Sequence, residues 1–311
     1  MKHRTAFFLV SSLLLLFPCK GSSMNGYRAL ISCGDGFLAA GSGGRMEWIS
    51  SKGLVIKSLQ VSLFGLNALL FNHQSMVVAG DSGTLLISSD QKSFRQVDVH
   101  SNSTVFSLVQ FNNLILAGSE QGLLLVGGEK DRFELLQLAL EGNIVSLSAN
   151  ETDCFGVTDR GEIIHSTDGK QWKIFYFNTY YSGYYKPCRF TSVLVNEHQL
   201  FVAGKHDDGT PALYISAEGT IWTERALTYT NDQNAYCNLE EVPASISYDA
   251  LEEQLLLVCS KGKIMKVPSC SHCNQVLNVT NENLTVLTQN AGNWLVVGED
   301  FHIHALEDGW K

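Results

Sequence analysis

An apolar strand that ends in Ala-Gly or a close variant, followed by a tight turn and a second strand, recurs seven times along this chain. Clear copies begin at Met76 (MVVAGDSGTLLISSDQKSF) and at Leu200 (LFVAGKHDDGTPALYISAEGTIW). Successive copies are separated by 39, 38, 39, 47, 55 and 39 residues, so four of the six intervals are nearly equal. Such a fixed period is the sequence signature of a repeat protein. The equivalent positions are Gly41, Gly80, Gly118, Val157, Gly204, Cys259 and Gly298.

Each repeat has the composition of short strands joined by turns. Apolar and polar residues alternate, β-branched residues are frequent, and Gly, Ser, Asp and Asn interrupt the runs. A period near 39 residues with three or four strands is typical of a propeller blade. The sequence therefore predicts an all-β, seven-bladed β-propeller of short three- to four-stranded blades. The last blade ends at Trp310, so either it has three strands or the segment before Tyr27 supplies the fourth.

The first 23 residues have the features of an export signal. A basic start at residues 2–4 precedes an apolar run at residues 6–17, which is shorter than the roughly 20 residues that span a bilayer. Small residues follow at Gly21 and Ser23. We expect residues 24–311 to form a single propeller domain, without a later transmembrane segment, in a secreted, periplasmic or cell-surface protein. The run Leu-Phe-Pro-Cys ending at Cys19 loosely resembles a lipoprotein signal, which makes Cys19 a candidate lipid anchor.

The chain contains eight cysteines, one of them in the signal segment. An exported chain meets an oxidising compartment, so we expect some of the remaining seven to pair and at least one to stay free or to bond another chain. Cys33, Cys154 and Cys259 lie in strand-like stretches and are interpreted as buried thiols. The disulfide candidates are Cys188 with Cys237, and Cys270 with Cys273, although each of the last two could also pair elsewhere.

A short motif follows the second repeated strand in the fourth copy. Ser166-Thr167-Asp168-Gly169-Lys170-Gln171-Trp172 resembles the Asp-box (BNR-like) repeat, with degenerate copies at residues 89–94 and 217–222. Together with the strand before it, the unit is similar to propellers of the photosystem II stability/assembly-factor type. The resemblance implies a scaffold role for Ser166, Asp168, Gly169 and Trp172, because the Ser and Asp side chains accept backbone hydrogen bonds and the aromatic ring packs between blades.

The charge and the glycosylation motifs bear on possible partners. A net charge of −9 with no concentration of Lys and Arg argues against a nucleic-acid partner. Four N-x-S/T sequons are glycosylation candidates if the chain passes through a eukaryotic secretory pathway. They lie at Asn102, Asn150, Asn278 and Asn283.

Two insertions account for the long intervals, at residues 178–189 and 228–242. Each lies between the last strand of one blade and the first strand of the next, so both are expected on one face, on either side of blade 5. The first is rich in tyrosine, which suits recognition surfaces because the ring offers a large, rigid, amphipathic contact area. Packing of these rings onto the propeller is the alternative. The candidate binding residues are Tyr180, Tyr181, Tyr184 and Tyr185, with Tyr236 in the second insertion.

These observations favour an exported, non-catalytic scaffold that binds a protein or a glycan through the loops of one face. It is expected to be monomeric and to need no metal or cofactor. The alternative is a glycan-active hydrolase or lyase with its site in the central channel. A sialidase-like site is disfavoured, since the chain has eight arginines in all and lacks that family's N-terminal Arg motif. His302 and His304 share a strand face, but two imidazoles without a carboxylate make a weak metal site.

Overall fold

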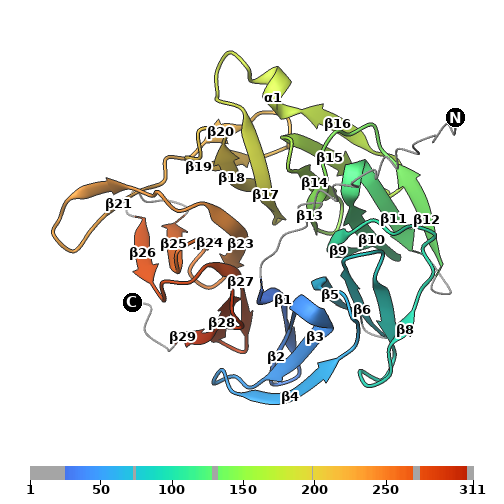
Figure 1. The fold of residues 1–311 in the computed structure, drawn as a ribbon. Coiled ribbons are helices and arrows are strands. Elements are labelled where there is room, and N and C mark those ends of the chain that lie inside the picture. The colour runs from blue at the N-terminus through green and yellow to red at the C-terminus, as the bar shows by residue number, and fades with distance from the viewer. Residues whose placement is uncertain (1–24, 73–74, 128–131, 198, 269–273, 307–311) are drawn as a thin grey trace, which may run out of the picture.

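The computed structural model describes residues 25–72, 75–127, 132–197, 199–268 and 274–306. Seven small antiparallel sheets stand side by side around a central axis, which confirms the predicted seven-bladed β-propeller (Figure 1). The predicted signal at residues 1–23 and the possible lipid anchor at Cys19 lie outside the described residues. None of the helices in the described part of the chain has the length and apolar character needed to cross a bilayer.

Six blades have four strands each, in simple sequential order. Blade 1 holds β1 (Tyr27–Cys33), β2 (Gly36–Gly41), β3 (Arg45–Ile49) and β4 (Val55–Gln60). Blade 2 holds β5 (Leu66–Asn72), β6 (Ser75–Gly80), β7 (Leu85–Ser88) and β8 (Arg95–Gln96). Blade 3 holds β9 (Val105–Phe111), β10 (Leu114–Ser119), β11 (Leu123–Gly127) and β12 (Phe133–Gln137). Blade 4 holds β13 (Ile144–Ala149), β14 (Cys154–Thr158), β15 (Glu162–Ser166) and β16 (Lys173–Tyr176).

Blade 5 holds β17 (Cys188–Val195), β18 (Leu200–His206), β19 (Pro211–Ser216) and β20 (Thr223–Glu224). Blade 6 holds β23 (Pro243–Asp249), β24 (Gln254–Cys259), β25 (Lys263–Pro268) and β26 (Gln275–Asn278). Blade 7 holds β27 (Leu284–Asn290), β28 (Asn293–Gly298) and β29 (Ile303–Leu306). The insertions add the one-turn helix α1 (Phe177–Tyr180) and a separate hairpin of β21 (Thr228–Thr230) and β22 (Tyr236–Asn238). Two 3₁₀ turns lie at Ser42–Gly44 and Glu120–Gly122.

The strand pairing corrects the repeat alignment at two positions. In blades 3 and 4 the residues that pair with the start of the first strand are Ser119 and Thr158, where the sequence pattern suggested Gly118 and Val157. With these positions the intervals become 39, 39, 39, 46, 55 and 39 residues. The repeat is therefore more regular than the Ala-Gly pattern indicated, because Ser and Thr replace Gly at the true position in two blades.

A close backbone contact explains why Gly is common at this position. A Cβ on Gly41 would lie 2.0 Å from the carbonyl oxygen of Gly26, and one on Gly204 would lie 2.1 Å from that of Arg189. In blade 3 the hydroxyl of Ser119 instead donates to the equivalent carbonyl, that of Thr104, at 2.7 Å. The close carbonyl therefore favours a small residue at this position. In blade 3 a serine fits there because its hydroxyl donates a hydrogen bond to that carbonyl.

The first strand of every blade carries a bulge. The register with the second strand shifts by one at the second residue of this strand in six blades and at the fourth in blade 5, so one residue per blade is left out of the ladder. The first strands lie at the axis, where these seven residues contribute to the lining of a cavity of about 250 Å³. They are Arg28, Asn67, Phe106, Val145, Thr191, Ala244 and Thr285.

The hydrophobic core lies between the blades. Each large cluster of buried side chains joins residues of two neighbouring sheets, such as Phe155 of blade 4 with Val202 of blade 5. Serines add hydrogen bonds across the same boundaries, since the hydroxyls of Ser146 and Ser192 accept the backbone N–H groups of Val193 and Ile246 in the next blade. Stacking therefore buries both faces of sheets that could not bury them alone.

Where the ring closes, blade 7 meets blade 1 by packing and by backbone hydrogen bonds. Among the described residues blade 7 has three strands, and the segment before Tyr27 meets the turn after β28 through a Gly26–Glu299 bridge and the Asp300 N–H, which donates to the Asn25 carbonyl at 2.7 Å. Within the described residues this matches the three-stranded alternative, while most of the segment before Tyr27 lies outside them. Residues 307–311 lie outside the described part of the chain.

Candidate binding face

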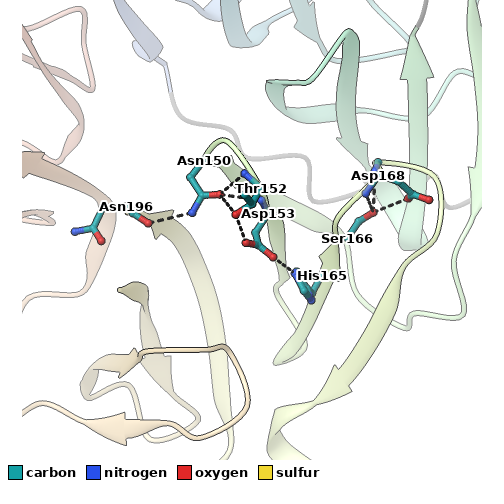
Figure 2. Close-up of polar contacts among 8 residues, drawn as sticks. Asn150, Thr152, Asp153, His165, Ser166, Asp168 and Asn196 are labelled. Carbon is teal, nitrogen blue, oxygen red and sulfur yellow. Dashed lines mark hydrogen bonds and ion pairs between the residues drawn. The ribbon is translucent and has the colours of Figure 1, made fainter. Parts of the chain in front are cut away.

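The third-to-fourth strand hairpin of blade 4 is fixed by its own side chains (Figure 2). Oδ1 of Asp168 accepts the N–H groups of Lys170 and Gln171 at 2.8 and 2.7 Å, and the Ser166 hydroxyl accepts that of Gly169 at 2.8 Å. These backbone donors hold the pKa of Asp168 below its usual range. Gly169 adopts a φ of 73°, which favours glycine, and the Trp172 ring packs against the core between blades 3 and 4. These residues form a scaffold.

Two further blades repeat parts of this arrangement. In blade 2, Oδ1 of Asp90 accepts the N–H groups of Lys92 and Ser93, both at 2.8 Å. In blade 5, the N–H of Gly219 donates to the Ser216 hydroxyl at 2.8 Å. The degenerate copies therefore keep part of the hydrogen bonding that fixes the turn, although their residues differ from the motif.

The connections of the propeller define two opposite faces. In an antiparallel sheet, turns alternate between its two ends. One face, the hairpin face, carries the turns between first and second and between third and fourth strands. The other, the connection face, carries the second-to-third turns and the links between blades. Both insertions belong to the connection face and flank blade 5, as α1 and the β21–β22 hairpin (Figure 1).

Phe177 anchors the tyrosine insertion (residues 178–189) to the propeller. Its side chain is fully buried, and its ring centroid lies 4.7 Å from that of Tyr214 and 5.3 Å from that of Phe190 in blade 5. Burying a phenylalanine side chain contributes about 1.5–3 kcal/mol. The insertion therefore starts from a fixed point in the core between blades 4 and 5.

Two of the candidate tyrosines pack inward. Tyr181 and Tyr185 are partly buried against this core. The Tyr181 hydroxyl accepts the N–H of Trp222 at 2.9 Å, and the Tyr185 hydroxyl donates to the carbonyl of the same residue at 3.3 Å. These two rings therefore pack the insertion onto blade 5. The packing alternative considered from the sequence thus applies to two of the tyrosines.

The other two candidates in this insertion face outward. Tyr180 and Tyr184 have exposed fractions of 65 % and 83 %. Each still touches an aromatic neighbour, since Tyr180 lies 5.2 Å from Phe175 and Tyr184 lies 6.4 Å from Tyr181 between ring centroids. The structure thus divides the tyrosines into two that hold the loop and two that are presented to solvent.

A buried polar group lies beneath the insertion. Nε2 of His206 is 3.0 Å from Oε1 of Glu224 in β20, and its Nδ1 is 3.3 Å from the carbonyl oxygen of Lys186 in the insertion. The neighbouring thiol of Cys188 is buried, and burial raises its pKa to about 12. The Cys188 thiol is therefore protonated at neutral pH and unsuited to nucleophilic chemistry.

The expected disulfide between the two insertions is not formed. Cys188 and Cys237 are both free in the structure, and Cys188 is buried inside blade 5 while Cys237 lies on the hairpin. The hairpin is instead fixed at its base by the amide of Asn274, which donates to the carbonyl of Thr228 at 2.8 Å. Tyr236 is 72 % exposed on β22. Cys270 and Cys273 lie outside the described residues.

The three cysteines interpreted as buried thiols are also free. Cys154 and Cys259 are fully buried, and burial raises the pKa of each to about 12. Cys33 is only partly buried.

A second polar cluster lies on the hairpin face (Figure 2). Oδ1 of Asp153 is 2.6 Å from Nε2 of His165, whose ring stacks on Phe155 at 4.3 Å between centroids. Oδ1 of Asn150 accepts the N–H groups of Thr152 and Asp153 at 3.0 and 2.8 Å. Asn150 also donates from its amide to the carbonyl of Asn196 in blade 5 at 3.1 Å. These groups mostly satisfy one another, so the cluster ties blade 4 to blade 5.

One cavity lies next to this cluster, and a second lies along blade 5. One of about 290 Å³ is lined by Asp153, Phe155 and Gln199, among others, and a shallow groove of about 560 Å³ follows the outer hairpin of blade 5 past Ile221. The groove is the larger of the two, and its lining includes Glu218, Glu224 and Arg225.

The four sequons differ in how far their side chains are free. Asn102 and Asn278 are exposed. The Asn150 amide is engaged as described, and the Asn283 amide donates to Oε2 of Glu299 at 2.8 Å. Asn283 also accepts the N–H of Lys261 at 2.9 Å. Two of the four amides are therefore part of the contacts between blades.

The described lining of the channel cavity is mainly apolar and neutral polar, with Arg28 as its charged residue. Glycoside hydrolysis uses a pair of carboxylates, and no Asp or Glu is present among the described residues that line the channel cavity. At its edge, Asp81 is occupied by Arg28 at 3.0 Å and by the Asn67 amide at 2.9 Å. Within the described ranges, no three His, Cys, Asp or Glu side chains are grouped so as to hold a metal ion.

Comparison with known proteins gives the fold and no family. Neither a scan against protein-family models nor a search of curated proteins produced a match. Among solved structures, the WD40 β-propeller domain of Doa1 is similar with a TM-score of 0.70 and 12 % identity, over 94 % of this chain and 95 % of that one. The computationally designed Ika8 protein gives a TM-score of 0.62 and 14 % identity, over 90 % and 82 % of the two chains. At these identities the likeness establishes that the chain is a β-propeller.

Proposed function

We propose that this protein is an exported, non-catalytic propeller that binds a protein or glycan partner through its connection face over blades 4 to 6. The observation that carries the proposal is the division of the tyrosine insertion. Tyr180 and Tyr184 are exposed on a loop that Phe177, Tyr181 and Tyr185 hold in place. A contact surface that is rigid before binding loses less conformational entropy on binding.

Two further features of the sequence support this role. The signal-like residues 1–23 favour export. The hydrogen bonds of Ser166 and Asp168, with their partial counterparts in blades 2 and 5, support assignment of the repeat to the Asp-box type. Rigid turns of this type would keep the blades in register while loops on the opposite face vary.

The proposal is tested by photo-crosslinking in cells of the native host. The photoreactive residue p-benzoylphenylalanine replaces Tyr184 in one variant and Leu251 in another. Leu251 is a matched control, because it is 82 % exposed and lies on the hairpin face of blade 6. We expect a discrete crosslinked species, identified by mass spectrometry, from position 184 alone. Equal or absent crosslinking at both positions would exclude the connection face as the binding face.

A further inference from the structure

Two cations face each other directly at the edge of the tyrosine insertion. Arg189 on β17 and Lys205 on β18 are partners in the strand register, and both side chains are exposed. Side chains of such a pair project from the same face of the sheet with Cβ atoms about 4.5–5.5 Å apart, and like charges in this arrangement are destabilising. The free protein therefore retains an unfavourable charge pair on its surface.

The neighbouring acidic groups only partly compensate this pair. Oδ1 of Asp207 lies 3.2 Å from Nε of Arg189, and Asp208 forms an ion pair with Lys186. Both pairs are solvent-exposed, so each contributes little and its partner is readily exchanged. No acidic side chain in the described ranges lies within ion-pair distance of the Lys205 ammonium.

Arg189 of the charged pair follows the exposed tyrosines closely along the chain. Arg189 lies five positions after Tyr184, so their Cα atoms are at most about 17 Å apart even in a fully extended chain. Lys186 lies between them. Counted with Asp207 and Asp208, this edge carries three cations and two carboxylates, on a chain whose net charge is −9, with 31 acidic and 22 basic residues.

We propose that this surface binds an acidic polypeptide segment. A carboxylate of the partner would lie between Arg189 and Lys205 and relieve their repulsion, while apolar or aromatic side chains of the same segment would contact Tyr180 and Tyr184. Arg and Tyr are the residues most enriched at protein–protein contacts. Three cations are too few for the multiple phosphate contacts of a nucleic acid. The proposal rests on the proposed function and names the partner's chemistry.

Binding is measured with three defined probes on the full-length mature protein. The first is a random copolymer of L-glutamate and L-tyrosine, the second is the matching copolymer of L-lysine and L-tyrosine, and the third is heparin. We expect the acidic copolymer to bind, with affinity that falls as salt is raised, and the basic copolymer not to bind. Lys205→Glu should weaken binding of the acidic copolymer by about tenfold or more.

Lys52→Glu serves as the matched control, because Lys52 is an exposed lysine on the hairpin face of blade 1. It should change the affinity by less than about twofold, as expected for a charge outside the contact. Unchanged binding in Lys205→Glu would overturn the inference. So would heparin binding that depends on Lys205 without any binding of the acidic copolymer, which would assign the surface to an acidic glycan. If crosslinking at position 184 persists while Lys205→Glu has no effect, the proposed function stands and the acidic partner is excluded.

Discussion

Phe301 of the last blade lies edge-on against Tyr27 of the first, with ring centroids 5.1 Å apart and ring planes at 90°. The guanidinium of Arg45 lies over the same Phe301 ring, 4.6 Å from its centroid. The Tyr27 hydroxyl donates to buried Glu47, and burial together with this contact raises the pKa of Tyr27. Phe301 has a φ of 59°, a strained value for a bulky residue. The closing contact therefore holds a backbone conformation that phenylalanine avoids.

Phe301→Ala should destabilise the propeller by about 2 kcal/mol, since it removes packing at the joint without relieving the strained backbone. Urea denaturation measures the change, with Phe71→Ala as a control because Phe71 is 49 % exposed in blade 2. A similar small effect in both variants would show that the joint does not depend on Phe301.

The two classes of tyrosine should separate binding from stability. Tyr180→Ser with Tyr184→Ser should abolish partner capture and leave the free energy of unfolding within about 0.5 kcal/mol of the wild type. Tyr181→Ser with Tyr185→Ser should cost about 2 kcal/mol or more, because both rings pack on the core and bond Trp222. Calorimetry and pull-down of the partner identified by crosslinking, on the same samples, make the comparison. Loss of stability in the first variant would assign those rings to packing as well.

Stability should fall on acidification through His304. Burial, and then the charge of His302, lower the pKa of His304 below its ordinary value of 6.5. The folded state thus binds this proton less readily than the unfolded chain, so the contribution is fully present above pH 6.5 and is lost as the pH falls through the folded-state pKa. In the wild type, the urea midpoint should be lower at mildly acidic than at neutral pH. In His304→Gln the difference between the two midpoints should be smaller. An unchanged pH dependence would remove His304 from the account.

The cysteines of the described blades should differ in reactivity. Cys237 is partly exposed and should react with an alkylating reagent in the native protein. Cys154, Cys188 and Cys259 should react only after unfolding, because burial raises their pKa values to about 12 and excludes the reagent. Peptide mapping after pulse alkylation identifies the labelled sites. A Cys188–Cys237 disulfide in the native protein would contradict this pattern.

Glycans, where the secretory pathway adds them, should occupy the exposed sequons. Asn102 and Asn278 have open side chains, whereas the amides of Asn150 and Asn283 bond backbone groups in neighbouring blades. Intact mass of protein secreted from a eukaryotic host, with single Asn→Gln variants, assigns the occupied sites. Occupancy at Asn150 in a protein of normal stability would show that its contact with Asn196 is dispensable.

The fold could be predicted from sequence because each blade repeats its pattern locally. The period, the turns and the positions of both insertions are all properties of contiguous residues. Other features depend on register. The Ala-Gly pattern did not identify Ser119 and Thr158, because a hydroxyl-bearing residue can stand opposite the bulge in place of glycine.

The candidate site was predictable in place but not in detail. A cluster of tyrosines marks the insertion, but the sequence alone does not show that Tyr181 is buried and Tyr180 exposed. That difference depends on which ring reaches Trp222 in the folded protein. The pairing of Arg189 with Lys205 likewise joins residues from two strands, and only the register brings them together.

The seven bulges have a consequence for how such a ring can change. The residue left out of each ladder is also one that faces the axis, as Arg28, Thr191 and Thr285 show. Its side chain can also bond across the joint between blades, since the hydroxyls of Thr191 and Thr285 donate to the carbonyls of Pro243 and Tyr27 in the next blade at 2.7 and 2.9 Å. A substitution at one of these seven positions therefore changes the lining of the channel and, where the side chain bonds the next blade, the contact between two blades as well.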